Sequence, residues 1–258
     1  MPNFCETGHA KNLANYFDLI ACLPKLGEGY NPPGTELSIE ALTAAGKRAT
    51  AAHNDVTSIE IDLRQLVATR NLVFTEMQST SKRVRDFLLI LKTDERTINA
   101  AKSLVGKING YSKSKSKTDE GAGIATLTEV NADGESSTDK NTRSISTAQL
   151  SFDMRCENFG KLVMLVEQHP SYECNEAALQ AKALRQQYNG IFEANRNVYS
   201  AEHDIEKARL LRNDLLYGNS DCICNLASNI KTYIKAAFGS ASREYEMVKS
   251  YEIKRIRV

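Results

Sequence analysis

Tryptophan is absent from this 258-residue chain, and proline occurs only five times. Because proline interrupts helices, its scarcity favours a helical protein, and the abundance of Ala, Leu, Lys and Glu points the same way. The formal net charge of +1 argues against a protein that holds nucleic acid through a large excess of positive charge. We therefore expect no nucleic-acid partner.

Long apolar runs are also missing. The longest, FLLIL at 87–91 and LVMLV at 162–166, are far shorter than the roughly 20 residues that a membrane-spanning helix needs. The first residues, MPNFCETGHAKN, lack the basic and then apolar pattern of a secretory signal. The sequence therefore predicts a cytoplasmic protein; an extracellular protein whose signal has been removed is the alternative.

Motifs that carry chemistry are absent as well. Of the four histidines only His9 has a glutamate three residues before it, Glu6, so the pair of Glu-x-x-His motifs that di-iron bundles carry on two helices is missing. The chain also lacks His-Glu-x-x-His, Gly-x-Ser-x-Gly and phosphate-binding glycine loops. The six cysteines lack the spacing of zinc or redox motifs and are expected to be free thiols. The sequence therefore predicts no catalytic residue, no metal site and no cofactor.

The chain repeats itself after a shift of 142 residues, which carries the pair Arg70-Asn71 onto Arg212-Asn213. The segments 17–71 and 159–213 share 13 identities in 55 positions without a gap. These identities fall on the apolar positions and at both ends of the segment. The pattern predicts an internal duplication.

Each copy contains one long predicted helix. From Leu42 to Met77, seam positions that are mostly apolar recur in alternating steps of three and four, which is typical of a helix that packs along a narrow seam. Thr35 and Asn175 are the expected N-caps, and Gly218 is the expected end of the second helix. Each helix should have about 42 residues and a length of about 63 Å. The predicted ranges are 36–77 and 176–217.

Shorter amphipathic segments flank both long helices, with apolar stripes at helical spacing. They are expected as helices at 11–26 and 80–92 in the first copy and at 154–168 and 221–238 in the second. A turn before and after each long helix would make its neighbours antiparallel to it. The sequence thus predicts an all-α fold, an elongated helical bundle built from two tandem three-helix repeats with approximate twofold symmetry.

The repeats and the segments around them define the expected domains. They are a helical repeat A at 1–110, a polar insert at 111–150, a helical repeat B at 151–240 and a C-terminal tail at 241–258. The insert is rich in Ser, Thr, Gly and acidic residues, which favours a flexible connector. The alternative is a small β-hairpin, because IATLTEV and RSISTAQL flank the turn sequence NADG.

The C-terminal sequence IKTYIKAAFGSASREYEMVKSYEIKRIRV carries a loose FG…S…EY pattern over about its last 25 residues. In this it resembles the C-terminal segments of a group of uncharacterised helical bacterial proteins. The resemblance implies a helical protein of bacterial type and brings no assigned activity.

The repeated arginines occupy a seam position that is otherwise apolar. A buried arginine is costly unless it is paired, so each is expected to meet a carboxylate. One interpretation is that such pairs set the register of the helices; the other is an anion-binding site at the bundle centre. The residues of these predicted seam pairs are Arg70, Asn71 and Asp62 in the first copy and Arg212, Asn213 and Asp204 in the second, with Glu60 and Glu202 as further carboxylates.

Together these features predict a non-catalytic helical scaffold that binds another protein or assembles with itself. Contacts are expected in the insert and the basic tail, because loops on a rigid scaffold usually carry recognition. The candidate contact residues are Lys113, Lys115, Lys117, Lys254, Arg255 and Arg257. The alternative is a membrane-active, pore-forming-like protein in which residues 121–150 insert into lipid.

Overall fold

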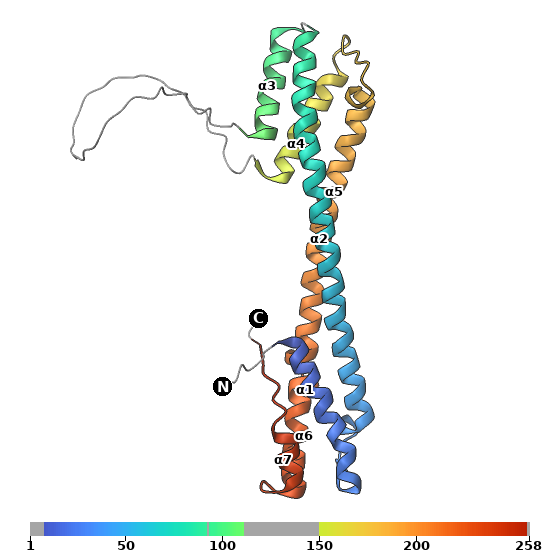
Figure 1. Ribbon diagram of the computed structural model, residues 1–258, viewed down its shortest axis with the longest axis vertical. Helices are drawn as coiled ribbons and strands as arrows, with labels where there is room; N and C mark the ends of the chain where they lie inside the picture. The colour runs from blue at the N-terminus through green and yellow to red at the C-terminus, as the bar shows by residue number, and fades with distance from the viewer. Residues whose placement is uncertain (1–7, 92, 111–149, 257–258) are drawn as a thin grey trace, which may run out of the picture. The chain divides into compact units, whose positions relative to one another are not determined.

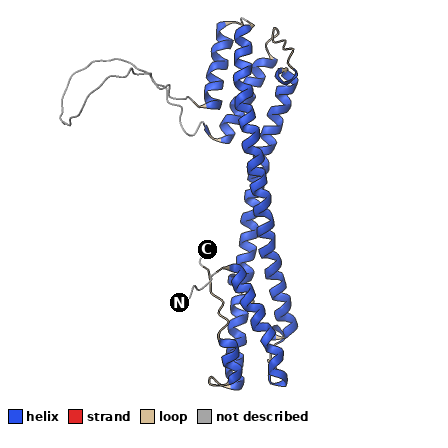
Figure 2. Cartoon of the chain, viewed as in Figure 1, coloured by secondary structure: helices blue, strands red, loops and turns tan. Residues whose placement is uncertain are grey.

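The computed structural model describes residues 8–91, 93–110 and 150–256. Throughout these ranges the chain forms helices and loops, and Figure 2 contains no strand within them. The all-α prediction is therefore confirmed. Most of the predicted insert, including the hairpin alternative, lies outside the described residues, as do Lys113, Lys115, Lys117 and Arg257.

Seven α-helices make up the described chain, with short helical turns between some of them. The α-helices are α1 (His9–Cys22), α2 (Ile39–Ile90), α3 (Glu95–Asn109), α4 (Phe152–Glu167), α5 (Ala181–Asn213), α6 (Ile223–Phe238) and α7 (Arg243–Lys249). The 3₁₀ turns are η1 (Leu23–Gly29), η2 (Thr35–Leu37) and η4 (Ala177–Leu179), and η5 (Asp214–Gly218) is a π-helical turn. Among the described residues, no helix combines the length and the apolar character needed to cross a membrane.

The first copy departs from its prediction at 80–92, which is not a separate antiparallel helix. The helix α2 continues through this segment to Ile90. No glycine or proline interrupts the sequence there. The hydroxyl of the buried Ser81 donates a hydrogen bond to the Gln78 carbonyl at 2.9 Å, one turn earlier in the same helix. The helix that does follow, α3, was not predicted; it begins where Asp94 accepts a hydrogen bond from the Thr97 amide at 3.0 Å.

Both long helices start later than predicted, because a 3₁₀ turn stands before each. Thr35 begins η2, and Ser38 is the residue whose hydroxyl caps the first turn of α2, accepting from the Ala41 amide at 3.2 Å. In the turn before α2 the Tyr30 hydroxyl donates to the Leu37 carbonyl at 2.7 Å. In the turn before α5 the Tyr172 hydroxyl donates to the Leu179 carbonyl at 3.0 Å.

The chain divides into two compact units, and each takes part of both long helices. Unit 1 consists of residues 1–68 and 197–258, and unit 2 consists of residues 69–196. These units cut across the predicted division along the chain, because each contains segments from both predicted repeats.

The core of unit 1 is formed by α1, the first part of α2, η5, α6 and one residue of α7. Tyr16 is fully buried in it and donates its hydroxyl to the Leu42 carbonyl at 3.1 Å, which joins α1 to α2. Gly46 lets these two helices approach closely, since a Cβ at that position would lie 2.8 Å from Cζ of Phe17. The buried residues include Leu19, Leu23, Leu42, Ala49, Leu216, Ile230 and Ile234.

The end of the chain belongs to this unit. After α7, residues 250–256 form an extended segment, the C-terminal strap, which Figure 1 shows running back alongside α6. Asn12 holds the strap on both sides of Lys254, donating to its carbonyl at 2.7 Å and accepting from its amide at 3.1 Å. The Lys231 ammonium donates to the Tyr251 carbonyl at 2.6 Å.

The core of unit 2 is formed by the second part of α2, α3, α4 and the first part of α5. Its close approach is between α4 and α5, where a Cβ on Gly160 would lie 2.7 Å from Cε2 of Tyr188. The α3 helix packs along α4, and Arg155 on α4 donates to the Ile108 carbonyl at 2.9 Å. The buried residues include Phe74, Met77, Leu88, Ile108, Phe159, Leu162, Leu184 and Ile191.

Candidate binding site at the end of α5

The helix α5 changes geometry at its C-terminal end. After Asn213 the backbone widens into the π-helical turn η5, which ends at Gly218 as predicted. Such wide turns are rare and are frequent at functional sites. The turn buries Leu216 and Tyr217, whereas Leu210 and Leu211 just before it are 69% and 53% exposed. Two large apolar side chains are therefore left in solvent beside an irregular helix end.

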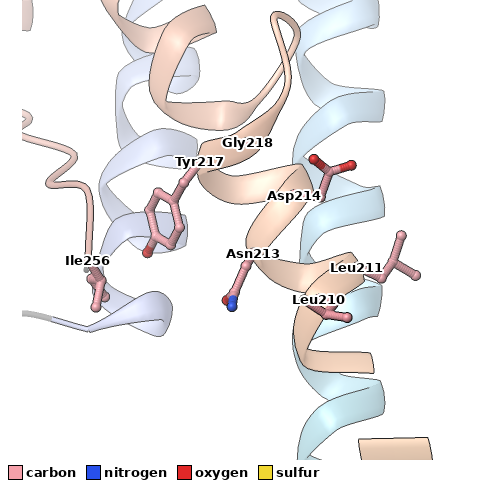
Figure 3. A pocket seen from close by; sticks show the side chains of 7 residues that line it. All are labelled: Leu210, Leu211, Asn213, Asp214, Tyr217, Gly218 and Ile256. Atoms are coloured by element: carbon pink, nitrogen blue, oxygen red, sulfur yellow. The ribbon is translucent and has the colours of Figure 1, made fainter. Parts of the chain in front are cut away.

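These leucines border a pocket, the α5-end pocket, with a volume of about 590 Å³. Figure 3 shows the side chains that form it, from α5, from η5 and from the C-terminal strap. They are Leu210, Leu211, Asn213, Asp214, Tyr217, Gly218 and Ile256. Most of this lining is apolar, and the pocket is open to solvent.

A group of polar side chains surrounds the Tyr217 hydroxyl, which is one end of a pocket residue. The hydroxyl accepts from Asn12 Nδ2 at 2.9 Å and lies 3.0 Å from His9 Nδ1. The His53 ring lies 6.3 Å from the His9 ring, and its Nδ1 atom is buried without a hydrogen-bond partner among the described residues. Burial lowers the pKa of His9, and the nearby Arg212 and His53 lower it further.

Arg212 lies beside this polar group and is only 9% exposed. Its Nε and Nη2 atoms donate to the Asn213 amide oxygen at 3.1 and 2.9 Å. Glu60, a predicted carboxylate partner, instead accepts from Arg209 at 3.0 Å. Burial lowers the pKa of Arg212, and Arg209 adds to that effect. The guanidinium is therefore bound by a neutral group in the described structure.

Arg70, which the predicted repeat pairs with Arg212, has different surroundings. The Arg70 guanidinium lies 3.9 Å from the centroid of the Phe152 ring, a cation–π contact within unit 2. Its Nε atom is buried and has no hydrogen-bond partner among the described residues. The neighbouring Asn71 is exposed. An aromatic face therefore occupies the place where a carboxylate was predicted.

The remaining predicted residues lie on surfaces or in the strap. Asp62 and Asp204 are exposed, and Asp204 lies 3.7 Å from the Lys207 ammonium. Lys254 lies 3.3 Å from Glu252, and Arg255 donates to the Asn225 amide oxygen at 2.8 Å. The two basic strap residues thus already have partners within unit 1.

No protein-family model, no curated protein and no solved structure matches this chain. Within the described ranges, no three His, Cys, Asp or Glu side chains come together in a way that would hold a metal ion. The five described cysteines are free thiols.

Sequence reasoning missed His9, Asn12 and Tyr217 as a group. The chain separation between His9 and Tyr217 is 208 residues, and none of the three belongs to a recognisable motif. The one local signal was Gly218, which marked the end of the helix but not the pocket beside it. Only the packing of α1 against η5 brings these side chains together.

Proposed function

We propose that this chain is a non-catalytic helical scaffold that binds protein through the α5-end pocket, with a second copy of the chain as its first partner. The observation that carries the proposal is the exposure of Leu210 and Leu211 at the edge of an open, mostly apolar pocket. Exposed apolar surface of this kind usually marks an interaction site. The helices behind it hold the pocket walls in place.

An internal duplication of a helical unit is part of the same proposal. The turns η2 and η4 occupy positions that differ by the predicted shift, and α2 and α5 begin at matching residues. The tyrosine hydrogen bonds at Tyr30 and Tyr172 also match, donor and acceptor alike. Approximate twofold symmetry is the arrangement that such a duplication would produce.

The close helix approaches add further support. Gly46 matches Tyr188 in the repeat, and residue 18, beside Phe17, matches Gly160. Each copy therefore places a glycine against an aromatic ring, but the glycine lies on the long helix in one copy and on the short helix in the other. The two contacts use different matched positions, but both bring the short helix and the long helix of a predicted copy close together.

Sedimentation over a range of protein concentrations tests the proposal. We expect the wild-type chain to self-associate and the double variant Leu210→Ser/Leu211→Ser to remain a monomer, because two exposed leucines would be lost from the contact. Leu72→Ser is the matched control, since Leu72 is 60% exposed in unit 2 and does not line the pocket. A wild-type chain that stays monomeric, or a control that loses association equally, would count against the proposal.

A further inference from the structure

Arg212 is buried without an anionic partner. The residue is only 9% exposed, and among the described residues both of its hydrogen bonds go to the neutral amide oxygen of its chain neighbour Asn213. Among the described residues, no carboxylate lies within ion-pair distance of it. A buried guanidinium without an anion is costly, and its planar fork of donors suits a carboxylate or phosphate. The amide oxygen of Asn213 therefore stands where a negative group would be held more strongly.

The surroundings of Arg212 supply further donors, and the nearby carboxylate of Glu60 is already bound by Arg209. The helix α1 starts beside it at His9, with no capping side chain and no acidic residue in its first turn, so its amide groups favour an anion. His53 Nδ1 is buried and has no partner among the described residues.

The corresponding corner of unit 2 contains an acid. There the first turn of α4 carries Asp153, which accepts from Asn195 Nδ2 at 2.6 Å. At the matching positions unit 1 has Lys11 and His53. Unit 1 has thus placed basic groups where unit 2 has an acid and its amide partner.

The pocket provides an apolar space next to this basic corner. Asn213 and Tyr217 belong to both, because they line the pocket and also bind Arg212 and His9. Asp214 is the one acidic residue in the lining of the pocket, and its carboxylate accepts a hydrogen bond from Asn219 Nδ2 at 2.7 Å. Figure 3 shows the Asp214 side chain pointing away from Asn213, on the opposite side of the helix.

We propose that the α5-end pocket binds an anion with an apolar body, whose head replaces the Asn213 amide oxygen as the acceptor of Arg212 while its body lies along Leu210, Tyr217 and Ile256. A monocarboxylate with a hydrocarbon chain is the simplest ligand of this class. The site uses the pocket of the proposed function and does not require a protein partner.

Calorimetric titration with three probes tests the chemistry of the head and the body. We expect octanoate to bind, octanol to bind at least about tenfold more weakly because it lacks the charge, and inorganic phosphate to bind at least about tenfold more weakly because it lacks the apolar body. Equal binding of octanoate and octanol would overturn the anion site. Equal binding of phosphate and octanoate would overturn the apolar part, and absence of octanoate binding would overturn the whole inference.

Variants locate the site. Arg212→Gln should weaken octanoate binding about tenfold or more, because a charge-assisted hydrogen bond is lost. Arg209→Gln removes the same charge one turn away from a half-exposed position and should change binding little. Equal losses in both variants would show that only the general charge of the surface matters, and would overturn the assignment to Arg212.

A second variant keeps the test informative if Arg212→Gln does not fold, as judged by circular dichroism. Ile256→Ala shortens a pocket wall on the strap and should weaken octanoate binding severalfold. Unchanged octanoate binding in Ile256→Ala would overturn the placement of the apolar body. Self-association is measured separately by sedimentation, so failure of the anion site and failure of the scaffold proposal are distinguishable.

Discussion

Replacing a single helical glycine by alanine provides a sharp test of the packing in unit 2. Gly160 is buried in α4, and a Cβ built there lies 2.7 Å from Cε2 and 3.1 Å from Cζ of Tyr188. The rigid ring must shift before the added methyl group can fit. Gly160→Ala gains about 1 kcal/mol of helix propensity, whereas overpacking a core costs about 1–3 kcal/mol. We therefore expect a net change between roughly zero and a loss of about 2 kcal/mol.

The matched control is Gly190→Ala in α5. No heavy atom lies within 4 Å of the Cβ that would be added there, so this variant should be stabilised by about 1 kcal/mol through the helix propensity alone. The difference between the two variants cancels the propensity and isolates the overpacking cost of about 1–3 kcal/mol. Urea unfolding followed by circular dichroism measures both values.

A third substitution identifies the ring as the cause. Tyr188→Leu removes the atoms that the new methyl group would meet, so Gly160→Ala should cost little in that background. The reasoning would be refuted if Gly160→Ala stabilised the wild-type chain as much as Gly190→Ala does. It would also be refuted if the cost of Gly160→Ala persisted after the ring was removed.

Three further predictions follow from individual contacts. Arg70→Met should lower the free energy of unfolding by no more than about 2 kcal/mol, which is the value of a desolvated cation–π contact such as that with Phe152. A loss of about 3–5 kcal/mol in urea unfolding would instead show that the substitution leaves a buried carboxylate unpaired. The folded state holds the pKa of His9 below its ordinary value of 6.5, so the stability that neutral His9 allows is present above about pH 6.5 and is lost as the pH falls, because the unfolded chain takes up the proton first. The melting temperature of His9→Gln should therefore decrease less on acidification than that of the wild type. Identical pH profiles of the two proteins would contradict this. Asn12→Ala should cost about 1–3 kcal/mol and increase hydrogen exchange at the Lys254 amide, because it removes the hydrogen bond that this amide donates to the Asn12 side chain; unchanged exchange would mean that Asn12 does not hold the strap.

Local patterns in the sequence determined the helical class and most helix positions. The three-four spacing of apolar residues identified both long helices, and Gly218 marked the end of the second. These predictions worked because helix formation depends on the side chains of one short stretch, which must cover one face of a cylinder. The helix starts were three to five residues early, since a 3₁₀ turn and an α-helix share the same capping residues.

Tertiary structure decided whether a helix continues through an ambiguous segment. The predicted helices 36–77 and 80–92 left a turn at 78–79, yet α2 passes through this segment without a break. Ser81 is buried there and accepts a hydrogen bond from Asn109 on α3 at 3.0 Å. Because its hydroxyl also donates to the Gln78 carbonyl within α2, both hydrogen bonds of Ser81 are made in the helical conformation.

Tertiary structure also decided the roles of the polar residues. The repeat singled out Arg70 and Arg212 as a pair with a shared role, but an aromatic ring meets one and an amide oxygen meets the other. The sequence carries no sign of the first contact, because Phe152 lies far from Arg70 along the chain, and it does not show that Arg212 binds its own neighbour Asn213 in place of a carboxylate. A one-dimensional pattern records which positions are buried, whereas the charge and shape that a buried side chain meets depend on residues brought together only by packing.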